Sequence, residues 1–293
     1  MGISVGRSIV SMPDRKKPYP TLLAFLVERF PQITENIWLE RIMLGKVLSE
    51  DDTPVSLTTA YTPNKRLFYF REVVEEPVIP FQEQILFSGD HLIVACKPHF
   101  LPVTPSGPYV SETLINRLKE KTGNHSLSPI NRIDRETAGL VLISVNKATR
   151  GLYQKMFMDG LVQKTYQAVV AYPGDTCKRE WLVENRLEQG EPWFRMQTRQ
   201  GMVNARSKII LIKTRGSQAL VHLFPITGKK HQLRIHLSGL GLPIVGDRYY
   251  PTLLEKTGDD YGLPLQLLSK KIEFRDPISG VEMSFESKRN LVF

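Results

Sequence analysis

The sequence predicts an α+β fold. Runs rich in β-branched residues recur along the chain, and amphipathic segments with helical spacing lie between them. With 293 residues, the chain is long enough for one large domain and one small domain. Its apolar fraction of 41% and charged fraction of 24% are ordinary for a globular protein, so the composition indicates neither a disordered chain nor a fibrous one.

The N-terminal part is expected to form a small α+β extension. Residues 1–20 are polar and contain several prolines, with a basic patch at residues 14–17 (DRKK), so we expect an extended arm. Residues 21–74 are expected to form a small module with helices over 21–30 and 34–44 and a strand over 66–73. Thr21 is a candidate N-cap of the first helix, and Gly45 is well placed to end the second.

The large domain is expected over residues 81–293, after a linker over residues 75–80 (EEPVIP) that contains two prolines. Strands are expected over 91–97, 140–145, 162–171, 181–187, 205–213, 218–224, 265–274 and 281–285, and helices over 112–121, 147–158 and 231–240. Ser111 is expected to cap the helix over 112–121. The run 140–145 (LVLISV) is apolar and rich in branched residues, which favours a strand buried on both faces over a buried helical segment.

A polar loop, residues 131–139 (NRIDRETAG), precedes this apolar run. A polar loop held by a rigid strand is a usual place for chemistry. Asp134 lies between Arg132 and Arg135, and neighbouring cations keep a carboxylate ionised, so Asp134 can act as a nucleophile or a base. The alternative is that Asp134 or Thr137 only satisfies hydrogen bonds of the loop backbone.

The charge of the chain points to a polyanionic partner. The net charge is +9 and the isoelectric point is about 9.5, which favours RNA or DNA over an anionic membrane; a generally basic protein is the alternative. Cys96 and Cys177 are too few for a disulfide framework or a thiolate zinc site, which fits a reducing compartment. No apolar stretch is long enough to be a signal core or a membrane span, so the cytoplasm is the expected location. No obligate protein partner is evident.

The segment NRIDRETAGL resembles the motif H-R-L-D-x-x-T-S-G-L of the RluA-type pseudouridine synthases. In that family the Asp is the catalytic residue, so the resemblance implies this role for Asp134 and places Arg132 beside the target base. The chain departs from the commoner motif at Asn131, Ile133 and Ala138, where His, Leu and Ser are usual. None of these changes affects the acid.

A second motif of the family, K-x-Y, is matched by residues 164–166 (KTY). Lys164 and Tyr166 are two positions apart on a predicted strand, so their side chains share one face. A tyrosine ring can stack on a flipped base, which contributes about 1–3 kcal/mol. The alternative is that Tyr166 is an ordinary core aromatic.

The third motif lies at residues 227–237 (TGKKHQLRIHL), which resemble T-G-R-x-H-Q-x-R-x-H-L. The resemblance implies an ion pair between Arg234 and the catalytic Asp, in which the guanidinium fork orients the carboxylate. Lys229 stands where Arg is usual, and it can meet a phosphate only as a point charge. We expect Lys164, Lys229 and Lys230 to follow RNA phosphates.

The resemblance covers roughly residues 81–285 and implies a long, mostly antiparallel sheet flanked by helices, with the RNA cleft across its middle. It also implies that no metal or organic cofactor is needed, and that the partner is RNA, either ribosomal or transfer RNA. Residues 21–74 resemble the small RNA-binding module of some ribosomal proteins, with Arg41 and Lys46 near the end of the second helix. A helical extension that packs on the main domain is the alternative.

The activity implied is the isomerisation of uridine to pseudouridine on a flipped-out nucleotide. Asp134 can act at C1′ as a nucleophile or at C2′ as a base, and both remain open. A non-catalytic RNA-binding protein on the same scaffold is one alternative. A metal hydrolase using His222, His231 and His236 is another, but the last two are five positions apart and would face apart on a helix.

Overall fold

The computed structural model describes residues 2–3, 7–15, 17–70, 72–73, 75–174, 178–255 and 258–293. Lys16 of the expected basic patch and Cys177 lie outside these residues. The chain folds into two compact units, one formed by residues 1–77 and 105–111 and the other by residues 78–104 and 112–293. The boundary between residues 77 and 78 falls inside the stretch where the sequence predicts a linker.

The first unit consists of two helices and short strands around a small core. Its elements are α1 (Leu22–Arg29), α2 (Glu35–Met43), β1 (Gly2–Ile3), β2 (Ser8–Ser11), β3 (Val47–Leu48), β4 (Arg66–Tyr69) and β5 (Glu72–Val73). Strands β2, β4 and β3 form an antiparallel sheet, and β1 pairs with β5. Thr21 caps α1, since its Oγ1 accepts a hydrogen bond from the N–H of Ala24 at 3.1 Å.

Part of the N-terminal arm differs from the expectation. Strand β2 lies within residues 1–20 and pairs along its whole length with β4. Val10 and Met12 are buried in the core of the first unit, and this burial favours an ordered strand over an extended arm. The single strand expected over 66–73 is two strands, β4 and β5, with Arg71 between them outside the described residues.

Residues 105–111 belong to the first unit, although the sequence places them in the large domain. The carboxylate of Glu76 accepts hydrogen bonds from the N–H groups of Val110 (2.5 Å) and Ser111 (2.9 Å). Ser111 is therefore held outside the following helix and does not cap it. The N-cap is Thr113, whose Oγ1 accepts a hydrogen bond from the N–H of Asn116 at 3.4 Å.

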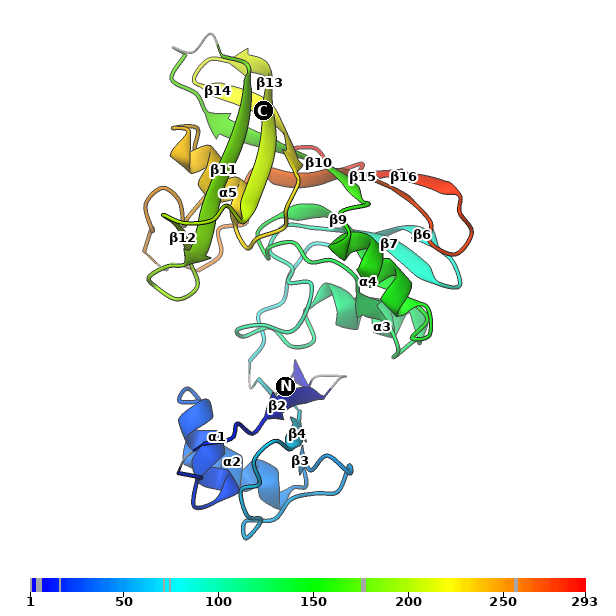
Figure 1. The fold of residues 1–293 in the computed structure, drawn as a ribbon, viewed down its shortest axis with the longest axis vertical. Helices are drawn as coiled ribbons and strands as arrows, with labels where there is room; N and C mark the ends of the chain where they lie inside the picture. The colour runs from blue at the N-terminus through cyan, green and yellow to red at the C-terminus, as the bar shows by residue number, and fades with distance from the viewer. Residues whose placement is uncertain are drawn as a thin grey trace. The chain divides into compact units, whose positions relative to one another are not determined.

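The second unit is built on one large sheet, which has 11 strands among the described residues (Figure 1). The strands are β6 (Gln84–Ser88), β7 (Leu92–Lys97), β8 (Ser128–Pro129), β9 (Ala138–Ser144), β10 (Gln163–Ala171), β11 (Glu180–Gln189), β12 (Met196–Arg199), β13 (Ala205–Arg215), β14 (Gln218–Pro225), β15 (Leu267–Arg275) and β16 (Glu282–Glu286). Their order is β12-β11-β13-β14-β10-β15-β9-β7-β6, with β16 beside β15 and β8 beside β9. The sequence did not predict β6, β8 or β12.

Three helices flank this sheet: α3 (Leu114–Thr122), α4 (Arg150–Met158) and α5 (Gln232–Gly239). Figure 1 shows α3 and α4 near β7 and β9, and α5 beside β11 and β13. Helix α4 packs through Tyr153 and Met156 into the core that β7 and β9 share. None of the helices in the described part of the chain is long and apolar enough to cross a bilayer.

Strand β9 is the buried strand that the sequence predicts, since all of its residues are buried. It pairs with β7 in antiparallel and with β15 in parallel orientation, and the other pairs between the described strands are antiparallel. The prediction of an α+β fold with a mostly antiparallel sheet is therefore confirmed. Gly139 has a φ of +112°, and a Cβ there would lie 2.2 Å from the carbonyl oxygen of Ser269, so only glycine lets β15 approach β9.

Candidate functional site

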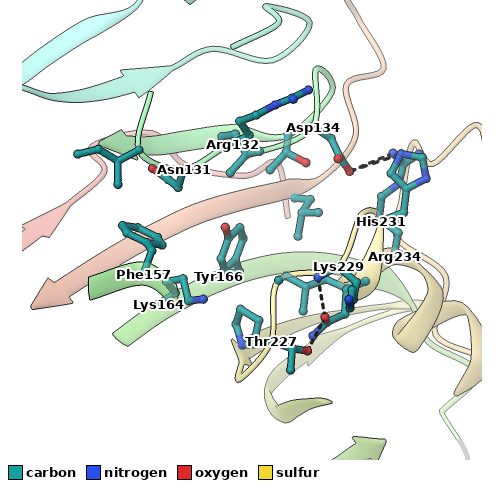
Figure 2. A pocket seen from close by; sticks show the side chains of 18 of the residues that line it. Asn131, Arg132, Asp134, Phe157, Lys164, Tyr166, Thr227, Lys229, His231 and Arg234 are labelled. Carbon is teal, nitrogen blue, oxygen red and sulfur yellow. Dashed lines mark hydrogen bonds and ion pairs between the residues drawn. The ribbon is translucent and has the colours of Figure 1, made fainter. Parts of the chain in front are cut away.

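One pocket of about 350 Å³ in the second unit joins segments that are far apart in the sequence (Figure 2). Its walls are the loop before β9, the start of β10 and the segment that leads into α5. The residues of the predicted site that line it are Arg132, Asp134, Lys164, Tyr166, Lys229 and Arg234. The three sequence motifs thus meet at one place.

Asp134 is carried by a loop whose start is fixed to β9. The Oδ1 of Asn131 accepts a hydrogen bond from the N–H of Leu142 at 2.8 Å. The N–H of Thr137 donates to the backbone carbonyl of Asp134 at 3.2 Å, so the turn leaves the carboxylate of Asp134 out of its own hydrogen bonding. The carboxylate is 24% exposed and faces Arg234 and His231, which argues against the purely structural alternative (Figure 2).

Lys97, the last residue of β7, and His99, just after it, contact backbone carbonyl groups of the same loop. The buried ammonium group of Lys97 donates to the carbonyls of Pro98 (3.0 Å) and Arg135 (2.9 Å), and Nδ1 of His99 lies 2.7 Å from the carbonyl of Glu136. Burial lowers the pKa of Lys97 to about 7, against the opposing charges of Glu136 and Asp134. Neither residue was predicted to have a role, although the pair Lys97-Pro98 at the end of a predicted strand was the available signal in the sequence.

Arg234 directs its guanidinium fork at Asp247 and not, as the sequence predicts, at Asp134. Nε and Nη2 donate to the two carboxylate oxygens of Asp247 at 2.9 and 2.6 Å, whereas Nη1 lies 3.4 Å from Oδ2 of Asp134. The side chains of Arg234 and Asp247 are 2% and 1% exposed. The expected ion pair with Asp134 is present, but it is formed by Nη1, the guanidinium nitrogen that does not bind Asp247.

The surroundings of Arg234 keep it charged and fixed in position. Burial alone would lower its pKa, but the hydrogen bonds and the charge of Asp247 raise the pKa of Arg234 above its ordinary value. The guanidinium also lies over the rings of Tyr249 (4.8 Å) and Tyr250 (5.4 Å). Oδ1 of Asp247 accepts further hydrogen bonds from the backbone N–H groups of these two tyrosines. The cation beside Asp134 is thus preorganised.

Tyr166 and Lys164 lie on β10, on the side of the pocket opposite the segment before α5 (Figure 2). Both side chains line the same pocket, as their spacing predicts, although the pairing of β10 with β15 shifts register between Thr165 and Tyr166. Burial and the charge of Asp134 raise the pKa of Tyr166 to about 12, so the phenol stays protonated at neutral pH. Burial lowers the pKa of Lys164.

Three further cations of the predicted site are exposed. Arg132 and Lys229 line the mouth of the pocket, and Figure 2 shows the Arg132 side chain pointing away from Tyr166. Lys230 is outside the lining, and its ammonium group lies 5.8 Å from the ring centre of Trp193. The structure therefore groups Lys229 with the pocket and Lys230 with the β11–β12 hairpin.

His231 is a pocket residue to which the sequence analysis gave no role in this chemistry. Its Nε2 lies 4.0 Å from Oδ2 of Asp134, and its Nδ1 lies 2.8 Å from the hydroxyl of Tyr250. Burial, followed by the charge of Arg234, lowers the pKa of His231 to about 3, so the ring is neutral beside the carboxylate. Its place in the third motif, three positions before Arg234, was the signal in the sequence.

The metal-hydrolase alternative is not supported by these positions. His222 faces Gln167, His231 faces Tyr250 and His236 faces Asn185, so the three rings have separate partners. Among the described residues, no group of three or more His, Cys, Asp or Glu side chains has the arrangement of a metal site.

Comparison with known proteins agrees with the geometry. A sequence model of the RNA pseudouridylate synthase family matches residues 91–239. The chain is 30% identical to a dual-specificity RNA pseudouridine synthase RluA of Pasteurella multocida over 72% of this chain and 94% of that protein. It is also 30% identical to a mitochondrial tRNA pseudouridine(32) synthase of Saccharomyces cerevisiae over 78% of this chain, but it spans only half of that protein.

A solved structure is similar as well. The structure of human RNA pseudouridylate synthase domain containing 4 matches 70% of this chain and 87% of its own chain, with a TM-score of 0.55 and 25% sequence identity. The family match begins at residue 91 and ends at residue 239, so it includes all three motifs and every residue of the predicted site.

Proposed function

Because the chain belongs to the RluA-type RNA pseudouridine synthase family and is an isomerase of that class, we propose that Asp134 converts specific uridines of structured RNA into pseudouridine. The observation that carries this proposal is the meeting of Asp134, Tyr166 and Arg234 around one pocket. The substrate is a ribosomal or transfer RNA, and the yeast relative named for a transfer RNA position favours the second.

The reaction breaks the bond from N1 of uracil to C1′ and forms a bond from C5 to the same carbon. The proton lost from C5 is balanced by the proton that N1 carries in the product, so no cofactor is required. Asp134 acts at C1′ as a nucleophile or at C2′ as a base. Uracil leaves as a delocalised anion, and one carboxylate can therefore suffice where glycosidases need two.

The pocket suits a nucleotide that has left its helix. Tyr166 can stack on the uracil, and Arg132 at the mouth can hold the displaced nucleotide. Arg234 orients Asp134 through the 3.4 Å contact, and Lys164 and Lys229 are placed to meet phosphate oxygens. Two apolar residues of the pocket lining, Phe157 and Leu233, help to exclude water. Water would otherwise attack C1′ after the bond to N1 breaks, and the base would be lost from the RNA.

Release of tritium tests this proposal directly, since RNA labelled at C5 of uridine loses the label when C5 bonds to C1′. Wild-type protein is expected to release tritium from transfer or ribosomal RNA, and Asp134→Asn is expected to release none while it still binds the RNA. Asp90→Asn is the matched control, because Asp90 is an exposed carboxylate outside the pocket lining. Binding by wild-type protein without release would favour the non-catalytic RNA-binding alternative.

We also propose that the two parts of the chain have different functions. Residues 81–293 carry the catalysis, residues 21–74 contact RNA through exposed cations such as Lys65, and Lys17 of the preceding arm meets a phosphate. Arg41, which the sequence analysis grouped with this role, is buried and lies 5.1 Å from the ring of Trp38, so it supports the module's core. Lys17→Glu with Lys65→Glu is expected to weaken RNA binding and leave single-turnover kcat unchanged. Location in the cytoplasm stays a prediction.

A further inference from the structure

The hairpin β11–β12 carries an aromatic side chain that no part of the proposed reaction uses. The chain has three tryptophans. Trp38 and Trp181 are 0% and 8% exposed, whereas Trp193, in the loop between β11 and β12, is 73% exposed. An indole that is largely exposed has no role in the core, and its large flat surface is suited to binding a partner.

Trp193 forms one wall of a shallow cavity of about 620 Å³. Its other walls come from the two strands and the loop between them, and most of them are polar: Gln189, Gly190, Glu191, Gln197 and Arg199. Gln197 donates its side-chain amide to the carbonyl of Gln189 at 3.1 Å, which fixes the amide at the floor of the cavity. An aromatic face beside amide and guanidinium groups matches the two needs of a nucleobase, which are stacking and hydrogen bonds to its edge.

Basic side chains lie in and beside this cavity. The ammonium group of Lys230 lies 5.8 Å from the ring centre of Trp193, and Lys229, next in the chain, lines the pocket of Asp134. Arg199 is the register partner of Arg186 across the β11–β12 ladder, and Arg186 itself forms an ion pair with Glu188 of β11 at 2.5 Å. Glu191 is the one carboxylate of the lining, and it is exposed. Arg199 and Lys230 together leave one positive charge beyond that of Glu191, which favours an anionic backbone beside the indole.

The hairpin is held to the site by a row of aromatic contacts. Phe194, next to Trp193, packs on Tyr249 with ring centres 5.3 Å apart, and Tyr249 lies over the guanidinium of Arg234 at 4.8 Å. The N–H of Met196 donates to the hydroxyl of Tyr250 at 2.8 Å. Trp193 therefore has a fixed place relative to the pocket, so one RNA strand can reach both.

We propose that Trp193, with Gln197, Arg199 and Lys230, forms a second nucleotide subsite that stacks an unpaired base of the RNA outside the target uridine. This inference rests on the proposed function, since it takes RNA as the substrate. The subsite contributes to affinity for RNA and not to the chemical step, because none of its members lines the pocket of Asp134.

Tryptophan fluorescence tests the subsite, because the exposed Trp193 is the indole that a bound base can quench. Titration of the full chain with oligouridylate is expected to quench the emission, and Trp193→Ala is expected to abolish the quenching. The same variant is expected to weaken the Kd for a uridine-containing RNA stem–loop by about 5-fold or more, while single-turnover kcat stays at the wild-type value. Trp193→Phe, which keeps a ring, should bind more tightly than Trp193→Ala.

Met202→Ala is the matched control, since Met202 is 85% exposed and lies in the loop after β12, outside the cavity lining. It is expected to leave both Kd and quenching unchanged. Unchanged Kd in Trp193→Ala would overturn the inference, as would a loss of kcat without a loss of affinity, which would mean that the hairpin acts only through Phe194 and Tyr249. Quenching by RNA in a protein that forms no pseudouridine would support the subsite and contradict the proposed function alone.

Discussion

Two groups of polar and charged side chains lie at or beside the pocket, and they differ in how firmly they are held. The anchored wall consists of Arg234, Asp247 and His231, which are buried and joined to one another or to Asp134 by close contacts. The exposed rim consists of Lys229 and Lys230, whose ammonium groups are solvated. Buried charges with several partners are preorganised, whereas exposed ones adapt to a ligand.

This difference suits the two groups to different functions, which are the orientation of Asp134 and the attraction of RNA. Under the proposed function, a fixed cation beside Asp134 can orient its carboxylate in every turnover. Solvated lysines attract RNA without selecting a geometry, and salt screens their effect. Changes in the anchored wall should therefore lower kcat, and changes in the exposed rim should raise KM.

Among changes to the anchored wall and the exposed rim, the largest effect is expected from Asp247→Asn. Asparagine cannot accept both guanidinium nitrogens as an anion does, so Arg234 loses its fixed position beside Asp134. A misplacement of this kind can lower kcat by about 100-fold. Single-turnover tritium release measures kcat, and the Kd for RNA is expected to stay close to that of the wild-type protein.

Asp276→Asn separates this effect from a general loss of stability. Asp276 is also a buried carboxylate, but it accepts hydrogen bonds from Tyr153 and Ser279 and does not line the pocket. Both variants should lower the melting temperature, and only Asp247→Asn should lower kcat. Wild-type kcat in Asp247→Asn would contradict the role of the anchored wall.

Variants of Tyr166 test whether its ring binds the uracil by stacking. Tyr166→Phe keeps the ring and should retain most activity, whereas Tyr166→Leu should lose about 10-fold or more in kcat/KM, in line with the stacking of one base. Equal losses in both variants would show that the hydroxyl, whose pKa burial raises to about 12, matters more than the ring.

Acid should destabilise the fold through His236, a buried residue of α5, the helix that also carries Arg234. Burial lowers the pKa of His236, which is 1% exposed, to about 4, below the value of about 6.5 in an unfolded chain. The unfolded state binds the proton more tightly, so the stability that neutral His236 contributes is present above pH 6.5 and is lost as the pH falls towards 4.

Urea unfolding at pH 7 and pH 5 measures this loss, which we expect to be about 1–2 kcal/mol for His236. His236→Asn should reduce the difference between the two pH values. His125→Asn is the control, because His125 is exposed and should leave the difference unchanged. A pH dependence that is the same in all three proteins would argue against a neutral, buried His236.

The smallest effect is expected from the exposed rim. Lys229→Ala and Lys230→Ala should each raise KM by a few-fold at low salt and leave kcat unchanged, and each should reduce the slope of log Kd against log salt by about 1. Lys213→Ala is the control, because Lys213 lies on β13, outside the pocket lining, and its ammonium lies over the ring of Phe293. A fall in kcat would place the lysines in the anchored wall instead.

The sequence indicated where the elements with strong local signals lie. Strand β9 follows from its apolar, branched residues, and α1 begins at the predicted cap Thr21. Strand β12 was missed because its four residues, MQTR, carry no apolar alternation. Ser111 was a plausible cap by type, but Glu76, distant in the sequence, holds its N–H elsewhere.

By itself the sequence determined the motifs, and through them the identity of Asp134, Tyr166 and Arg234 as candidate site residues, because residue type and local spacing are properties of the chain. Only the tertiary structure decided which charges pair. In the structure, Arg234 forms its bidentate pair with Asp247, and Lys97 donates a hydrogen bond to the loop that carries Asp134. Trp193 is largely exposed to solvent. Such choices depend on distances between segments that local patterns do not encode, and on burial, which sets whether a charge needs a partner.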